Sequence, residues 1–139
     1  MRVSVYHNVA RDEAGRMINF DGYESGHPIV HVFEADIDLG DEVFASALAE
    51  MVWTACNLGP DELTGRMATL ARAYRDRRLR SLSVGDVVAL GEGDDSEERV
   101  AMCVDAVGFS FVRTDRLNIV TTCEHGTQPW PLDARPVHV

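Results

Sequence analysis

Two pairs of side chains in this sequence have the spacing of metal ligands. His27 and His31 are four residues apart, and Cys123 and His125 are two residues apart. On a strand, spacings of two or four place side chains on one face, and zinc binds nitrogen and sulfur donors of this kind. However, His27 precedes a proline at an expected strand boundary, and the two pairs are far apart in the chain. We therefore expect structural or exposed histidines, with no metal and no other cofactor.

Cys123 is also the cysteine with the most polar neighbours, in the sequence T-T-C-E-H-G. A nearby histidine can lower the pKa of a thiol and make it nucleophilic, and on a strand His125 returns to the face of Cys123. No oxyanion-stabilising or orienting group can be named beside this pair, so we assign no catalytic residue. A small hydrolase or metal enzyme remains an alternative. Cys56 and Cys103 have apolar neighbours, which is typical of buried, reduced thiols.

Asp86 follows Gly85 at the start of an expected strand. A carboxylate in this position more often accepts hydrogen bonds from turn amides than acts as a catalytic acid. Asp105 is the more unusual carboxylate, because it lies among apolar residues; if buried, it needs a partner such as Arg80 or Arg99. We keep Asp86 as a candidate binding residue, together with Tyr23 of the D-G-Y sequence.

Arginines gather at the end of the second expected helix. Residues 61 to 80 contain six arginines and three acids, a net charge of +3 in a chain of formal net charge -10. Such a patch can bind phosphate or an acidic partner, although pairing with carboxylates of the same chain is commoner. A nucleic-acid-binding module that uses this patch is therefore an alternative function. Its candidate residues are Arg72, Arg75, Arg77, Arg78 and Arg80.

The net charge of -10 opposes general binding to nucleic-acid phosphates. The acidic residues between 92 and 98 are most simply a solvated loop, but carboxylates along a rigid face can imitate DNA, as in antirestriction-like inhibitors. No apolar run is long enough to cross a membrane, and the N-terminus has no signal-peptide pattern. We therefore expect a cytoplasmic protein that binds no membrane, and we leave the oligomeric state open.

Period-two and period-four patterns predict the elements that position these residues. We expect helices over residues 41–58, capped by Asp41, and 62–78, with a late start because Gly65 weakens the first turn. The long segment 10–28 is either a recognition loop or a mobile hairpin, of which the hairpin is the simpler interpretation. We expect strands at 2–9, 29–36, 87–90, 99–107 and 117–121, with 109–111 extended.

These elements predict an α+β domain over residues 1–125. We expect an antiparallel sheet of four to six strands, with one long helix packed across a face and a second, shorter helix beside it. Val100, Met102 and Val104 are expected in the core. Residues 126–139 contain three of the five prolines and are expected to form an extended tail that lies on its own domain.

The sequence R-S-L-S-V-G-D-V-V at 80–88, followed by V-G-F at 107–109, resembles the YodL-like family. That family consists of small accessory proteins of bacterial plasmids, phages and conjugative elements. The V-Y-H-N-V, D-G-Y and G-H-P sequences are similar to a group of small actinobacterial and actinophage proteins, and V-G-D-V-V is also similar to a turn of PUA-like barrels. The resemblance implies that the protein belongs to a mobile genetic element or its host, and it does not imply any particular reaction.

We therefore expect a non-enzymatic accessory protein of a phage, plasmid or actinobacterial host. It would bind a host- or element-encoded protein, and its alternatives are the nucleic-acid module and the DNA mimic. The stretch 80–112 is expected to be a scaffold. Its functional surface is expected where the scaffold meets the 10–28 loop and the arginines before it.

Overall fold

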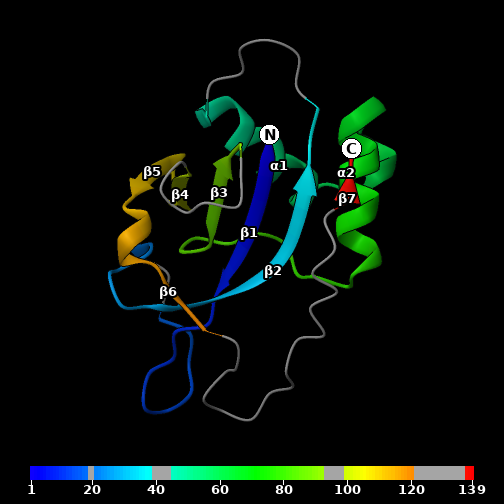
Figure 1. The fold of residues 1–139 in the computed structure, drawn as a ribbon. Helices are drawn as coiled ribbons and strands as arrows, with labels where there is room; N and C mark the ends of the chain where they lie inside the picture. The colour runs from blue at the N-terminus through cyan, green and yellow to red at the C-terminus, as the bar shows by residue number, and fades with distance from the viewer. Residues whose placement is uncertain (19–20, 39–44, 93–98, 121–136) are drawn as a thin grey trace.

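The computed structural model describes residues 1–18, 21–38, 45–92, 99–120 and 137–139. The fold is α+β, as predicted: within these residues, two α-helices pack against one mixed sheet of seven strands (Figure 1). The elements are β1 (Arg2–Asn8), β2 (Pro28–Asp36), α1 (Ala45–Asn57), η2 (Pro60–Glu62), α2 (Gly65–Asp76), β3 (Val87–Gly91), β4 (Val100–Val104), β5 (Phe109–Val112), η4 (Thr114–Arg116), β6 (Asn118–Ile119) and β7 (Val137–His138).

The strand order is β5-β4-β3-β1-β2-β6, and β7 also pairs with β2. β1 is therefore central, with antiparallel neighbours on both sides, which explains why a strand that begins at residue 2 is buried. The prediction of an antiparallel sheet holds from β5 to β2 but is wrong at the β2 edge, where β6 and β7 pair in parallel. Hairpins enforce antiparallel pairing, whereas β6 and β7 reach β2 from distant parts of the chain.

Both helices cover one face of the sheet. α1 buries Leu48, Val52 and Cys56, which are spaced by four residues, as its apolar pattern predicted. α2 begins at Gly65, whose φ of 57° favours glycine, so the predicted late start is confirmed. It ends at Asp76, two residues early, and Arg78 then adopts a positive φ of 56°. Asp41, the predicted N-cap, lies outside the described residues.

The opposite face of the sheet has no helix among the described residues. A small cluster lies there instead, built from Tyr6, Ile29, Val87, Ala89 and Ala101. Tyr23 from the 10–28 segment and Leu117, which follows η4, pack against it. Tyr23 and Leu117 therefore cover part of this face of the sheet.

Most of the expected tail lies outside the described residues, since the structure resumes at 137. Val137 and His138 form β7 on β2, and the backbone amide of Val139 donates to Asp36 at 2.8 Å. The last residues thus pack on the domain's own sheet.

Candidate functional site

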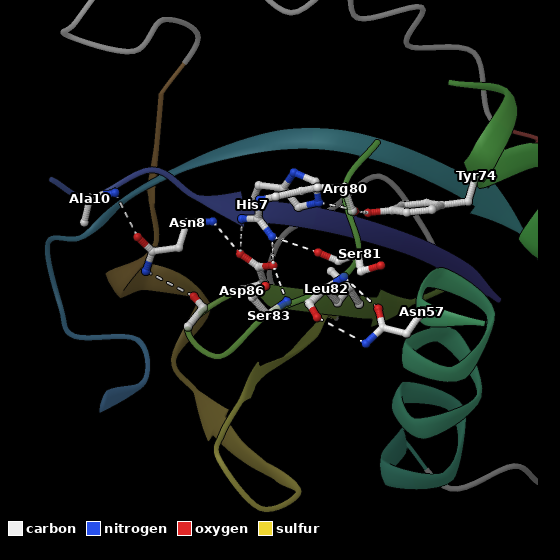
Figure 2. A network of polar contacts seen from close by, with 11 residues as sticks. His7, Asn8, Ala10, Asn57, Tyr74, Arg80, Ser81, Leu82, Ser83 and Asp86 are labelled. Carbon is white, nitrogen blue, oxygen red and sulfur yellow. Dashed lines mark hydrogen bonds and ion pairs between the residues drawn. The ribbon is translucent and has the colours of Figure 1, made fainter. Parts of the chain in front are cut away.

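Asp86 is the centre of a buried polar network (Figure 2). Its carboxylate accepts a hydrogen bond from the backbone amide of Ser83 at 2.8 Å, which is the turn chemistry predicted for it, and another from the amide of Asn8 in β1, also at 2.8 Å. Arg80 donates to both oxygens, at 2.6 and 2.8 Å. Burial alone would lower the pKa of Arg80, but the bond to Asp86 and its charge outweigh burial and raise that pKa. The result is a bidentate ion pair.

Tyr74 and His7 extend this network into the helical layer. The Tyr74 hydroxyl donates to the Arg80 carbonyl at 2.7 Å, so it accepts the 2.9 Å hydrogen bond from His7 Nε2. This arrangement fixes His7 as the neutral Nε2–H tautomer. Burial, assisted by the positive charge of Arg80 and opposed by Asp86, lowers the pKa of His7 to about 4. His7 therefore stays uncharged at neutral pH.

Two asparagines complete the network. Asn8 donates to the Gly85 carbonyl at 3.1 Å, and Asn57 both accepts from and donates to the backbone of Leu82. The turn before β3 is thus fixed to β1 on one side and to α1 on the other. Because Asp86 is fully buried, its carboxylate positions the fold and is not accessible to a ligand.

The five candidate arginines have different surroundings. Arg75 donates to the carbonyls of Asn57 and Leu58 at the end of α1, and Arg77 lies 5.3 Å from the centre of the Phe33 ring. Arg80 is held by Asp86, as described above. Arg72, Arg75 and Arg78 are exposed. Three of these guanidinium groups therefore have partners inside the domain.

Tyr23 fixes the 10–28 segment to the C-terminal part of the sheet. Its hydroxyl donates to the Arg116 carbonyl at 2.9 Å and accepts from the Asn118 amide at 3.4 Å. Its own amide donates to Cys103 Sγ at 3.2 Å. Tyr23 is thus a structural clamp in this arrangement, and the segment is attached to β4 and β6.

Tyr23→Phe tests this clamp. We expect the variant to lose about 1 kcal/mol of unfolding free energy, because it loses the hydroxyl that bridges two backbone groups. Amide hydrogen exchange at Asn118 should accelerate while exchange in β3 keeps its wild-type rate. Unchanged exchange at Asn118 would show that the hydroxyl does not hold β6.

The histidine and cysteine chemistry that the sequence left as an alternative is not assembled among the described residues. His27 Nδ1 accepts from the Glu24 amide, whereas His31 lies against the Tyr6 ring. No group of three or more His, Cys, Asp or Glu within the described part of the chain is placed to hold a metal ion. Cys123 and His125 lie outside the described residues. Burial raises the pKa of Cys103 to about 11, against a smaller effect of the Tyr23 amide, so it remains a thiol.

An ion-pair cluster that the sequence reasoning missed lies on the helix-free face. Arg2 contacts Glu34 at 3.3 Å and Asp36 at 3.1 Å, and Arg99 donates to the buried Ser4 hydroxyl at 3.1 Å. Ser4 in turn lies 3.4 Å from Glu34. The opposite charges at paired positions of β1 and β2 were the sequence feature that could have predicted this cluster. These contacts join neighbouring strands of the sheet through groups of opposite charge, which indicates a structural role.

The apolar surface around β5 is the exposed feature that the rest of the fold does not use. Val107, at the tip of the β4–β5 hairpin, is 93% exposed, and Phe111 on β5 is 73% exposed. Val100 was predicted to lie in the core, but it is 39% exposed, whereas Met102 and Val104 are buried as predicted. β5 ends the strand order and lies on the side of the molecule away from α2 (Figure 1). We call Val100, Val107 and Phe111 the β5 surface.

A mostly apolar hollow of about 240 Å³ adjoins this surface through Val100. It lies between the start of α1 and the strands that α1 covers. A hollow of this size can receive one apolar side chain of a partner. Its lining consists of Met1, Ala45, Leu48, Leu90, Gly91, Glu92 and Val100.

Comparison with known proteins gives no information on function, so the function proposed for this chain is argued from the geometry of the structure. No protein-family model matches the chain, and no curated protein or solved structure matches it. The resemblance to the YodL-like family therefore stays a prediction. Among the described residues, no helix combines the length and the apolar character needed to cross a membrane.

Proposed function

We propose that this chain is a non-enzymatic accessory protein that binds another protein through the β5 surface. The observation that carries the proposal is the exposure of Phe111 and Val107, at 73% and 93%, on the edge of the sheet. The proposed source is a phage, a plasmid or an actinobacterial host, and the proposed location is the cytoplasm. The partner is a host- or element-encoded protein.

The energetics favour a partner for this surface. Burying a phenylalanine side chain that was exposed is worth about 2 kcal/mol, and aromatic residues in the centre of an interface supply much of its binding energy. Single exposed apolar residues are ordinary, but here Phe111 lies on β5, which ends the strand order among the described residues. Val107 lies at the tip of the β4–β5 hairpin, and Val100 lies at the other end of β4. Within the described part of the chain, the surface thus offers both apolar area and a strand with no neighbour on its outer side.

The alternatives have less geometric support. The nucleic-acid module requires the arginine patch, yet Arg75, Arg77 and Arg80 contact groups of their own domain. The DNA mimic depends on the acidic run, of which residues 93–98 lie outside the described part of the chain. The β5 surface needs neither feature.

Affinity capture with matched variants tests the proposal. Phe111→Asp should reduce the amount of a specific captured protein at least about tenfold, because a charge would be buried in the interface. Ile18→Asp is the control, since Ile18 is an exposed apolar residue of the 10–28 segment, at 42% exposure. Capture that survives Phe111→Asp and is lost with Ile18→Asp would contradict binding through β5.

A further inference from the structure

We infer that β5 binds its partner by strand addition, and that the partner supplies an extended, basic segment with apolar residues at alternate positions. This inference rests on the proposed function, because it specifies how the β5 surface binds protein. Backbone direction, side-chain direction and charge each support it.

Among the described residues, two residues of β5 have backbone groups that point away from its partner strand β4. Val104 donates to Asp86 and accepts from Gly85, so its backbone groups point toward the β3 side. In an antiparallel pair of strands, opposite residues alternate between hydrogen-bonded and non-hydrogen-bonded pairs. Because Val104 bonds toward β3, its pair with Phe109 across β4 and β5 is not hydrogen-bonded, and neither is the pair Met102–Phe111 two residues along. Phe109 and Phe111 therefore direct their N–H and C=O groups away from β4. The bond from Asp105 N to Gly108 O, which closes the hairpin, agrees with this register.

The side chains of β5 make the same edge favourable for an apolar strand. Phe109 packs against the helix-side core, and Phe111, two residues later, shares its face. An added strand would place alternate side chains beside Phe111, where they can cover its exposed ring. Its other side chains would lie beside Ser110 and Val112 on the opposite face.

The β5 edge lacks the usual protection against such pairing. Natural edge strands commonly carry a charge, a proline or a bulge. The β5 sequence F-S-F-V contains no charged residue and no proline. At the other end of the sheet, β2 is paired with β6 and β7. Within the described residues, β5 is thus the open end of the sheet.

Charge selects between two possible occupants of the edge. A second copy of the chain would bring together two molecules of net charge -10 each, which disfavours their association. A basic segment is attracted by the same charge and associates faster. The exposed Glu92 follows β3 and adjoins the hollow beside Val100, where its carboxylate lies 3.6 Å from the N-terminal amine. We therefore assign the edge to a basic partner segment.

A short peptide of alternating lysine and valine is the probe, with an alternating glutamate and valine peptide as its control. Amide hydrogen exchange followed by NMR should show about tenfold protection of Phe109 and Phe111 by the basic peptide, with Ser110 and Val112 unchanged. Equal protection by the acidic peptide, or no protection of Phe109 and Phe111, would overturn the inference. The inference would also be overturned if sedimentation showed that the free protein is a dimer and the same two amides were protected in that dimer.

Two substitutions of Phe111 separate the backbone bond from the side chain. Phe111→Ala removes the ring and keeps the outward N–H, whereas Phe111→Pro removes both. Proline is tolerated on an edge strand whose N–H faces solvent, so denaturation midpoints should confirm that both variants fold. We expect Phe111→Pro to bind the basic peptide about tenfold more weakly than Phe111→Ala. If both bind equally while Phe111→Asp loses the captured protein, strand addition is wrong and the proposed function stands.

Discussion

Asp86→Asn should lower the unfolding free energy by about 3 kcal/mol and the melting temperature by roughly 10 °C. The carboxylate is fully buried and accepts from four donors: the Asn8 and Ser83 amides and two nitrogens of Arg80. An asparagine of the same shape turns an NH2 group toward those donors. It also leaves the guanidinium of Arg80, 35% exposed, without its counter-charge.

Asp115→Asn is the matched control for this prediction. Asp115 also forms a bidentate pair, with Arg113 at 2.7 and 3.0 Å, but both side chains are mostly exposed. Exposed pairs contribute little to stability, so the urea midpoint should equal that of the wild type. If Asp86→Asn also leaves the midpoint unchanged, the buried network does not hold the turn before β3.

His7 should make the protein less stable in weak acid. Its folded-state pKa is about 4, against about 6.5 in the unfolded chain. Between these values the unfolded chain binds a proton that the folded protein does not, so stability falls as the pH falls. This contribution is fully present above pH 6.5 and lost progressively down to pH 4. We expect a loss of about 2 kcal/mol by pH 5.

His7→Gln isolates this effect. Glutamine keeps an N–H for the Tyr74 hydroxyl and has no proton to gain, so its urea-derived stability should vary less between pH 7.5 and 5 than that of the wild type. His138→Gln is the control, because the His138 side chain is 82% exposed. Wild type and His7→Gln with the same pH slope would show that His7 is not the titrating group.

Local patterns in the sequence were sufficient for most of the fold. Alternation placed β1 through β4 within one or two residues at most boundaries, and the four-residue apolar spacing identified the buried face of α1. The parallel pairing of β6 and β7 was not predictable, because no turn connects them to β2. Register along a distant edge depends on contacts that a single strand sequence does not encode.

The candidate site was less predictable than the fold. The role of Asp86 followed from its turn sequence, but charge alone grouped Arg75, Arg77 and Arg80, which contact three different parts of the domain. The exposure of Phe111 could not be predicted from its residue type. Alternation along a strand shows which face of the sheet the side chain lies on, but it does not show how far the helices extend over that face. Its exposure depends on the position of β5 at the end of the sheet, which only the strand order reveals.

Site-specific photo-cross-linking tests most directly whether β5 is the binding surface. A photoreactive phenylalanine analogue in place of Phe111 should yield a cross-link to a second, different protein in an actinobacterial lysate. The same analogue at Trp53, which is 38% exposed on α1, should not yield it. Cross-links at position 53 without any at position 111, or at position 111 only to a second copy of this chain, would contradict binding of a partner protein through β5.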